Sequence, residues 1–89
     1  MIPPGSTIGI LGGGQLGRML AVAAAQLGYR CHIYSPERDS IAAEVSAKFT
    51  CADWHDHAAL SEFAQDCAVV TYEFDDAMRA GERHYLKDR

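Results

Sequence analysis

The chain has 89 residues, a formal net charge of −4, and apolar and charged fractions of 48% and 22%. This length suits one small domain, and the composition is that of an ordinary globular protein. A mildly acidic chain without clustered Lys and Arg argues against a surface for nucleic acid or anionic membrane. There is no apolar run near the roughly 20 residues that span a bilayer and no basic leader segment, so we expect a cytoplasmic protein.

The first third of the chain predicts a strand, a tight turn and a helix. Residues 1–6 contain Pro and Gly and are expected to form a flexible lead-in. The apolar run Thr7–Leu11 predicts a buried strand. After a glycine-rich turn, apolar residues recur at the spacing of one helix face, namely Leu16, Leu20, Ala23 and Leu27. This pattern predicts a helix over Gln15–Leu27 that ends at Gly28.

The middle of the chain predicts two further strands joined by a short helix. Residues 30–34 read as a second strand that stops at Ser35-Pro36, because proline has no amide hydrogen for the ladder. Ser40 is suited to cap a short helix that runs to about Ala47. Residues 48–51 predict a short third strand.

The remaining segments predict a helix, a strand and a polar tail. Asp56 is a suitable N-cap for a helix over residues 57–66, which carries apolar side chains on one face. Residues 67–72 form a strongly apolar fourth strand. Residues 75–89 are polar, and Asp75 at their start could cap a last helix.

The alternation of strands and helices predicts an α/β fold. We expect a Rossmann-like parallel sheet of about four strands in the order 3-2-1-4, with helices on both faces, over residues 7–74. In such a sheet, ligands bind at the carboxyl ends of the strands where the strand order reverses. Here that point lies between the first and fourth strands, where the glycine turn and Thr71 to Phe74 meet.

The glycine turn matches the pattern G-x-G-x-x-G with Gly12, Gly14 and Gly17. Glycines at these positions permit a tight turn, close approach of a ligand and close packing of the helix, whose first amides attract anions. A dinucleotide site also requires an acidic residue directly after the second strand, where Ser35-Pro36 stands instead. The pattern therefore favours a single phosphate over a dinucleotide, and a tight turn without ligand is the third alternative.

The cysteines and histidines give no sign of a catalytic or metal centre. Three widely spaced cysteines, Cys31, Cys51 and Cys67, do not form a disulfide pattern and are expected to be buried as small apolar residues. His55 and His57 lack further ligands at a recognised metal spacing. We therefore predict no catalytic residue and no metal site.

Several segments together resemble a known enzyme family. "GILGGGQLGRML" followed by "AAQLGY", then "AAEVSAKFTCADWHDHAAL" and "VVTYEF", are similar to the N-terminal domain of the N5-carboxyaminoimidazole ribonucleotide synthetase family. The resemblance covers about Thr7 to Phe74. It implies a pre-ATP-grasp domain of an ATP-grasp ligase in purine biosynthesis.

The family resemblance also implies a reaction and a binding site. Enzymes of the family use ATP, with Mg²⁺, and bicarbonate to carboxylate 5-aminoimidazole ribonucleotide. By this resemblance Gly14, Gln15 and Leu16 lie against the substrate phosphate, and Glu73 accepts hydrogen bonds from ribose hydroxyls. With Gly12 and Gly17 of the anion site, these residues form the predicted substrate site.

The sequence departs from the family after "YEF", where the ATP-grasp domains do not follow. We therefore expect this chain alone to be inactive and to bind neither ATP nor Mg²⁺, and to have the parent's ATP-grasp domains as partners. Two alternatives stay open: a nicotinamide-dinucleotide-binding domain of an oxidoreductase, and a non-catalytic fragment that associates with itself. Since the family's enzymes are commonly dimers, a homodimer is also among the expected partners.

Overall fold

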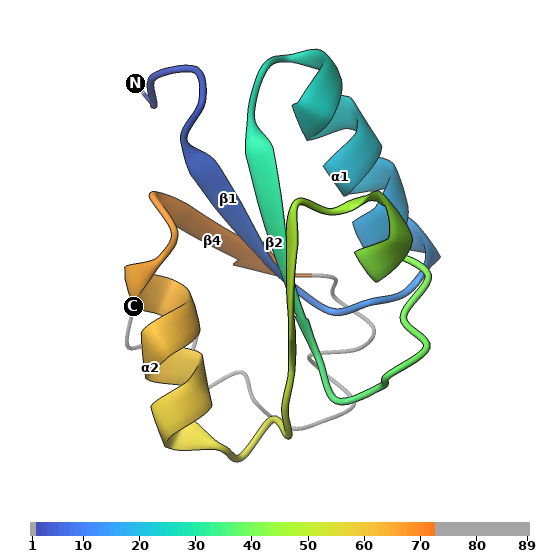
Figure 1. Cartoon of the computed structure of the whole chain (residues 1–89), viewed down its shortest axis with the longest axis vertical. Helices are drawn as coiled ribbons and strands as arrows, with labels where there is room; N and C mark the ends of the chain where they lie inside the picture. Colours follow the sequence, from blue (N-terminus) through green and yellow to red (C-terminus); the bar gives the residue numbers. More distant parts are fainter. Residues whose placement is uncertain (1, 73–89) are drawn as a thin grey trace.

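The computed structural model describes residues 2–72, and within them four strands alternate with helices (Figure 1). The elements in chain order are β1 (Thr7–Leu11), α1 (Gln15–Gln26), β2 (Arg30–Ser35), the short 3-10 helix η1 (Ala43–Val45), β3 (Lys48–Cys51), α2 (His57–Gln65) and β4 (Val69–Tyr72). Glu73 and the tail 75–89, with its expected helix, lie outside the described residues.

The strands form one parallel sheet in the order β3-β2-β1-β4, which confirms the predicted topology. In the register of the sheet, Leu11 at the end of β1 pairs with Tyr34 of β2 on one side and with Tyr72 of β4 on the other. The carboxyl ends of these three strands therefore meet at one edge. This edge is the place where the strand order reverses, and it is where parallel sheets bind their ligands.

The two faces of the sheet are covered by different helices (Figure 1). On one face Ile10 and Ile33, which are 1% and 0% exposed, pack with Ala21 and Ala24 of α1. On the other face Leu11 and Tyr34 pack against Phe63 of α2. Full burial of an Ile or Phe side chain contributes roughly 1.5–3 kcal/mol, so these two clusters hold the helices on the sheet.

The face of α1 that packs on the sheet differs from the apolar line read in the sequence. The buried residues of the helix are small: Gly17, Ala21 and Ala24. The bulkier line points outward instead, with exposed fractions of 47% for Leu16, 37% for Leu20 and 72% for Leu27. Small side chains on the buried face allow a helix to pack close to the sheet.

Two other local expectations are corrected. The predicted helix between Ser40 and Ala47 is only the three-residue η1. Its N-cap is Ala42 rather than Ser40, although Ser40 Oγ accepts a hydrogen bond from the Ala43 amide at 3.3 Å. The fourth strand begins at Val69 rather than Cys67, because the Cys67 amide still bonds the Ala64 carbonyl at the end of α2.

Residues 2–6 are held to the start of the sheet by several hydrogen bonds. The Gly5 amide donates to the Gly28 carbonyl at 2.9 Å, and the Tyr29 hydroxyl donates to the Ile2 carbonyl at 2.8 Å. The flexibility expected of this lead-in stays a prediction. Within the described part of the chain, no helix has the length and apolar character to cross a membrane.

Candidate binding site at the carboxyl edge of the sheet

The glycine turn leaves β1 at the edge where the strand order reverses. Gly12 has a φ of 122°, in the region that side chains other than glycine rarely adopt. Its amide donates to the Tyr34 carbonyl at 2.9 Å and so extends the β1–β2 pairing by one bond. Glycine at this position lets the chain turn sharply from the strand toward α1.

Gly13, which the sequence did not single out, is held by the loop that follows β2. The Ser40 hydroxyl donates to the Gly13 carbonyl at 2.9 Å, and the Ala42 amide donates to the same oxygen at 3.2 Å. A side chain at Gly13 would collide with Ser40 and would lie 3.0 Å from Ser35 Cβ. The sequence signal for this contact is that Gly13, the middle one of three consecutive glycines, is not required by the G-x-G-x-x-G pattern.

Helix α1 begins directly after this turn. Gly14 is its N-cap, with φ −85° and ψ −164° and no side-chain hydrogen bond, and no acidic residue stands in the first turn. Gln15 and Leu16 are exposed, whereas Gly17 is buried. A helix start without acidic side chains presents the positive end of the helix dipole to solvent, which suits an anionic group.

Five of the six predicted site residues lie at this sheet edge: Gly12 and Gly14 in the glycine turn, and Gln15, Leu16 and Gly17 in the first turn of α1. The sixth, Glu73, lies outside the described residues. The strand before it does end beside the turn, since Tyr72 pairs with Leu11.

The end of β2 differs from that of a dinucleotide site. Ser35 is 1% exposed, and its Oγ accepts a hydrogen bond from the Glu37 amide at 3.2 Å. Pro36 and Glu37 are exposed. The position where a ribose-binding acid is required therefore carries a buried hydroxyl that is bonded to its own loop.

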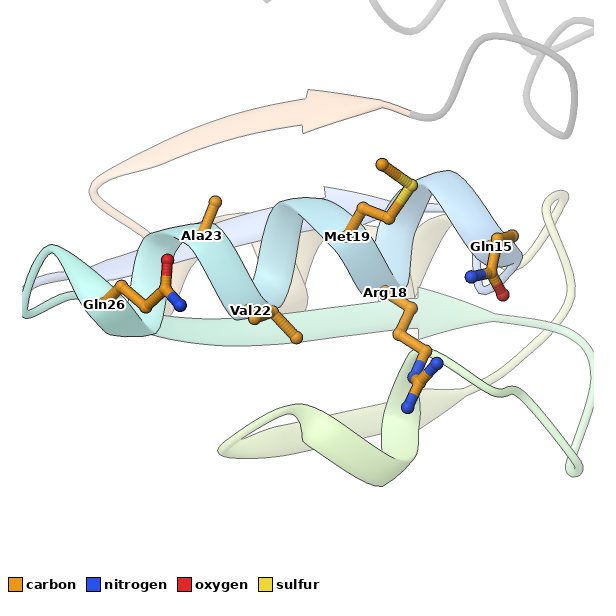
Figure 2. A pocket seen from close by; sticks show the side chains of 6 residues that line it. All are labelled: Gln15, Arg18, Met19, Val22, Ala23 and Gln26. Carbon is orange, nitrogen blue, oxygen red and sulfur yellow. The ribbon is translucent and has the colours of Figure 1, made fainter.

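An open hollow of about 350 Å³ runs along the outer side of α1 (Figure 2). The figure shows Arg18 and Val22 pointing toward the side of η1, and Met19 and Ala23 pointing the other way. Gln15 lines this hollow and also belongs to the predicted substrate site at the start of α1. Arg18 is exposed and stands one turn from the helix start, a position that suits either a phosphate contact or a solvated charge.

The cysteines are only partly as expected. Cys31 is buried, and burial raises the pKa of its thiol, which keeps it protonated and unreactive. Cys67 is half-buried, but Cys51 is exposed, so its expected burial was wrong. Cys51 is the last residue of β3, which lies at the edge of the sheet, and its Sγ contacts the Pro36 carbonyl at 3.6 Å.

Comparison with known proteins identifies the relatives of this fold and turn. A family model described as the ribonucleotide synthetase pre-ATP-grasp domain matches residues 5–86. The chain belongs to this family. Several of the relatives in the comparison are named N5-carboxyaminoimidazole ribonucleotide synthase, as the sequence resemblance implied.

Two curated relatives and one solved structure show how much of each relative's length this chain covers. The bifunctional purine synthesis protein purC/E of Dictyostelium discoideum is 55% identical over 88% of this chain and 8% of its own length. The N5-carboxyaminoimidazole ribonucleotide synthase of Brucella melitensis is 51% identical over 83% of this chain and 20% of its own. The N5-carboxyaminoimidazole synthetase of Staphylococcus aureus, solved with ADP, has a TM-score of 0.81 and 41% identity over 84% of this chain and 20% of that one. The chain thus spans a fifth or less of the length of these relatives.

Proposed function

We propose that this chain is the ribonucleotide-binding N-terminal domain of an N5-carboxyaminoimidazole ribonucleotide synthetase, an ATP-dependent carbon–nitrogen ligase of purine biosynthesis. In the parent protein, ATP and bicarbonate would carboxylate 5-aminoimidazole ribonucleotide. The observation that carries the proposal is the glycine turn at the β1–β4 edge, in a chain whose relatives are named for this synthesis. ATP and Mg²⁺ would bind to parts of the relatives that this chain does not cover.

In this proposal the residues of the turn hold the phosphate of the ribonucleotide. Amides at the start of α1, at Gly14, Gln15 and Leu16, would donate to phosphate oxygens, and the helix dipole would add to the attraction. Gly12 and Gly17 would allow the turn and the close packing of α1. Glu73 would accept hydrogen bonds from the ribose hydroxyls, because a carboxylate can accept two such donors. No residue of the chain is assigned a catalytic role, and the chain alone is expected to be inactive.

The test is an amide NMR titration of the chain with 5-aminoimidazole ribonucleotide, with parallel samples of ribose 5-phosphate, inorganic phosphate and NADH. We expect shifts at residues 12–17 and at Glu73 with the first two ligands, and shifts at residues 12–17 alone with phosphate. Shifts at Ser35 to Glu37 with NADH would instead support the dinucleotide alternative. Amide chemical shifts that do not change with any of the four ligands would contradict binding by this domain.

Two variants with a matched control sharpen the titration. Glu73→Ala should weaken ribonucleotide binding and leave phosphate binding unchanged, whereas Glu44→Ala, which removes an exposed carboxylate in η1, should change neither. Gly14 has a φ of −85°, which alanine can also adopt. Gly14→Ala should weaken the binding of both the ribonucleotide and phosphate, because it places a methyl group where the phosphate would lie. Equal effects of Glu73→Ala and Glu44→Ala would remove Glu73 from the site.

Self-association is a second candidate property, and the outer side of α1 favours it. Large apolar side chains are exposed on this helix or directly after it: Leu16, Met19, Leu20, Val22 and Leu27. Large exposed apolar side chains, where they gather on one surface, are typical of a protein contact. Light scattering over a range of concentrations would test it. A mass that rises with concentration, and that Leu27→Lys returns to the monomer value, is expected; a constant monomer mass rejects it.

A further inference from the structure

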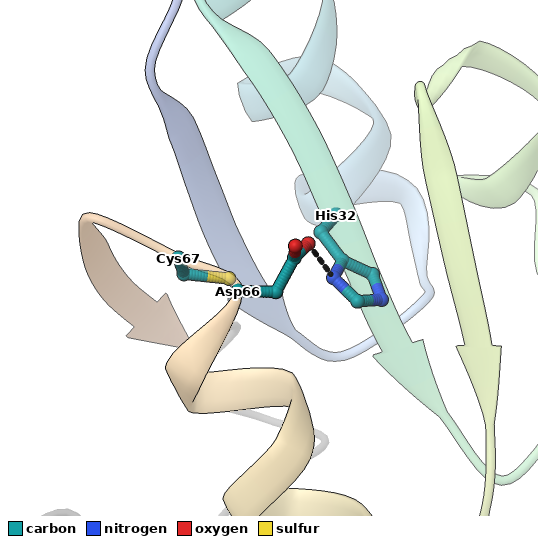
Figure 3. Close-up of side chains that lie close together, drawn as sticks. All are labelled: His32, Asp66 and Cys67. Carbon is teal, nitrogen blue, oxygen red and sulfur yellow. Dashed lines mark hydrogen bonds and ion pairs between the residues drawn. The ribbon is translucent and has the colours of Figure 1, made fainter.

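A polar group lies on the α2 side of the sheet, away from the glycine turn (Figure 3). His32 projects from the middle of β2 and is 2% exposed, between Phe63 of α2 and the edge strand β3. Asp66 is the C-cap of α2, and Cys67 follows it in the turn into β4. Figure 3 shows the Asp66 carboxylate directed at the His32 ring, with Cys67 next to it.

The atoms of this group are close enough to share an ion. His32 Nδ1 is 2.9 Å from Asp66 Oδ2, and the ligand atoms of His32, Asp66 and Cys67 all lie within 4.8 Å of one another. In a tetrahedral zinc site with ordinary bond lengths, ligand atoms stand about 3.4–3.6 Å apart. The ligand atoms that now stand farthest apart would have to approach by about 1 Å to surround a metal ion.

The second nitrogen of the His32 ring is already placed as in a metal site. His32 Nε2 is 2.6 Å from Thr50 Oγ1 on β3. When the Nδ1 atom of a neutral histidine binds a metal, the other nitrogen carries the hydrogen and donates it to a nearby oxygen, which fixes the ring. Thr50 supplies this acceptor, so the ring is oriented with Nδ1 toward Asp66.

We infer that His32, Asp66 and Cys67 form a binding site for one zinc ion, with water as the fourth ligand. Nitrogen, carboxylate oxygen and sulfur are the ligands that Zn²⁺ accepts in tetrahedral sites. Binding would release the Cys67 proton to solvent. The single proton of the neutral His32 ring would move from Nδ1 to Nε2, which then donates to Thr50 Oγ1. Since Asp66 is 39% exposed, water can reach the ion from that side.

Two present contacts have to be exchanged when the ion binds. Cys67 Sγ donates to the Phe63 carbonyl at 3.2 Å, and the Lys48 ammonium lies 3.7 Å from Asp66 Oδ2. Lys48 is 60% exposed and can turn into solvent. Because its positive charge opposes a cation at Asp66, Lys48→Gln should strengthen zinc binding.

The test is a Co²⁺ titration of the reduced full chain without an affinity tag, followed by its absorption. We expect one equivalent to bind, with a thiolate-to-cobalt band in the near ultraviolet that Zn²⁺ abolishes. Cys67→Ser should remove this band, whereas the matched variant Cys51→Ser, which changes an exposed thiol elsewhere, should keep it. Thr50→Val should weaken affinity about tenfold or more.

A wild-type chain that gives no thiolate band would overturn the inference, and so would a band that Cys51→Ser removes and Cys67→Ser leaves. Circular dichroism establishes that each variant is folded. If Cys67→Ser fails to fold, Asp66→Asn provides the same test, because it removes one ligand at a half-exposed position and should lower affinity at least tenfold. Unchanged affinity in Asp66→Asn would reject the site.

Discussion

Replacement of Gly13 by alanine tests whether the loop after β2 fixes the glycine turn. The new methyl carbon would lie 2.8 Å from Ser40 Cβ and 3.0 Å from Ser35 Cβ, and it would overlap the Ser40 hydroxyl. Both serines are buried, at 5% and 1% exposure, so neither can move into solvent. Overpacking of this kind costs about 1–3 kcal/mol, and the loss of the Ser40–Gly13 hydrogen bond costs about 1 kcal/mol more.

Gly13→Ala should therefore destabilise the chain by about 2–4 kcal/mol, which lowers the Tm by at least about 8 °C in a domain of this size. Urea unfolding monitored by the fluorescence of Trp54, the single tryptophan, measures the free energy of unfolding. Trp54 packs 5.7 Å from the Tyr34 ring, so its signal reports on the sheet.

The control for this prediction is the same substitution in a Ser40→Gly background. Ser40→Gly removes the colliding side chain, so Gly13→Ala should then cost at least about 1 kcal/mol less than it does in the wild type. If Gly13→Ala leaves stability within about 0.5 kcal/mol of the wild type, or costs the same in both backgrounds, the Ser40 packing does not hold the turn.

Three further predictions concern the α2 side of the sheet. Gly9→Ala would place a methyl carbon 2.5 Å from Cys67 Sγ and 2.8 Å from Phe63 Cζ, so it should lower the free energy of unfolding in urea by about 1–3 kcal/mol; an unchanged value would contradict this packing. Asp56→Ala removes the cap in which Asp56 Oδ1 accepts from the Ala59 amide at 3.0 Å, and it should cost about 1 kcal/mol, whereas Glu62→Ala on the exposed side of α2 should cost less than half of that. Burial lowers the pKa of His32 below its ordinary value of about 6.5, against the opposing effect of the hydrogen bond that the ring donates to Asp66. The unfolded chain therefore binds more protons between the lowered value and about 6.5, and stability should fall as the pH drops through that window; an NMR titration that puts the His32 pKa at or above 6.5 would refute this.

The topology could be predicted from the sequence because each step rests on local signals. Gly28, Pro36 and Asp56 mark ends and starts of elements, and the apolar runs between them alternate in length and period. Right-handed crossovers then leave few possible strand orders, and β3-β2-β1-β4 is the one observed.

The buried face of α1 could not be predicted in the same way. Two lines of apolar residues fit the helical period, one through Leu16 and Leu20 and the other through Gly17, Ala21 and Ala24. Hydrophobicity favours the bulkier line. The structure buries the smaller one, because the turn at Gly12 sets α1 close to the sheet. The spacing between layers is a tertiary property that the period alone does not contain.

The contacts that complete both candidate sites were missed because they join distant parts of the chain. Ser40 reaches Gly13 across 27 residues, and His32 meets Asp66 across 34. In the sequence Ser40 is a candidate helix cap and the histidines show no metal spacing, so neither contact has a local signal. Only the parallel sheet, which places β2 between β1 and β3, brings these partners together.

The packing of Ser40 on Gly13 also bears on which ligand the turn can accept. The loop from β2 covers the turn on the side where a dinucleotide would extend its ribose toward the end of β2. The other side of the turn adjoins β4, since Leu11 pairs with Tyr72. A ligand on the glycine turn is then expected to extend toward β4, which suits one phosphorylated ribose better than two nucleosides. Ser40→Gly should therefore disturb the turn without creating a dinucleotide site, because Ser35 and Pro36 still stand in place of the acid.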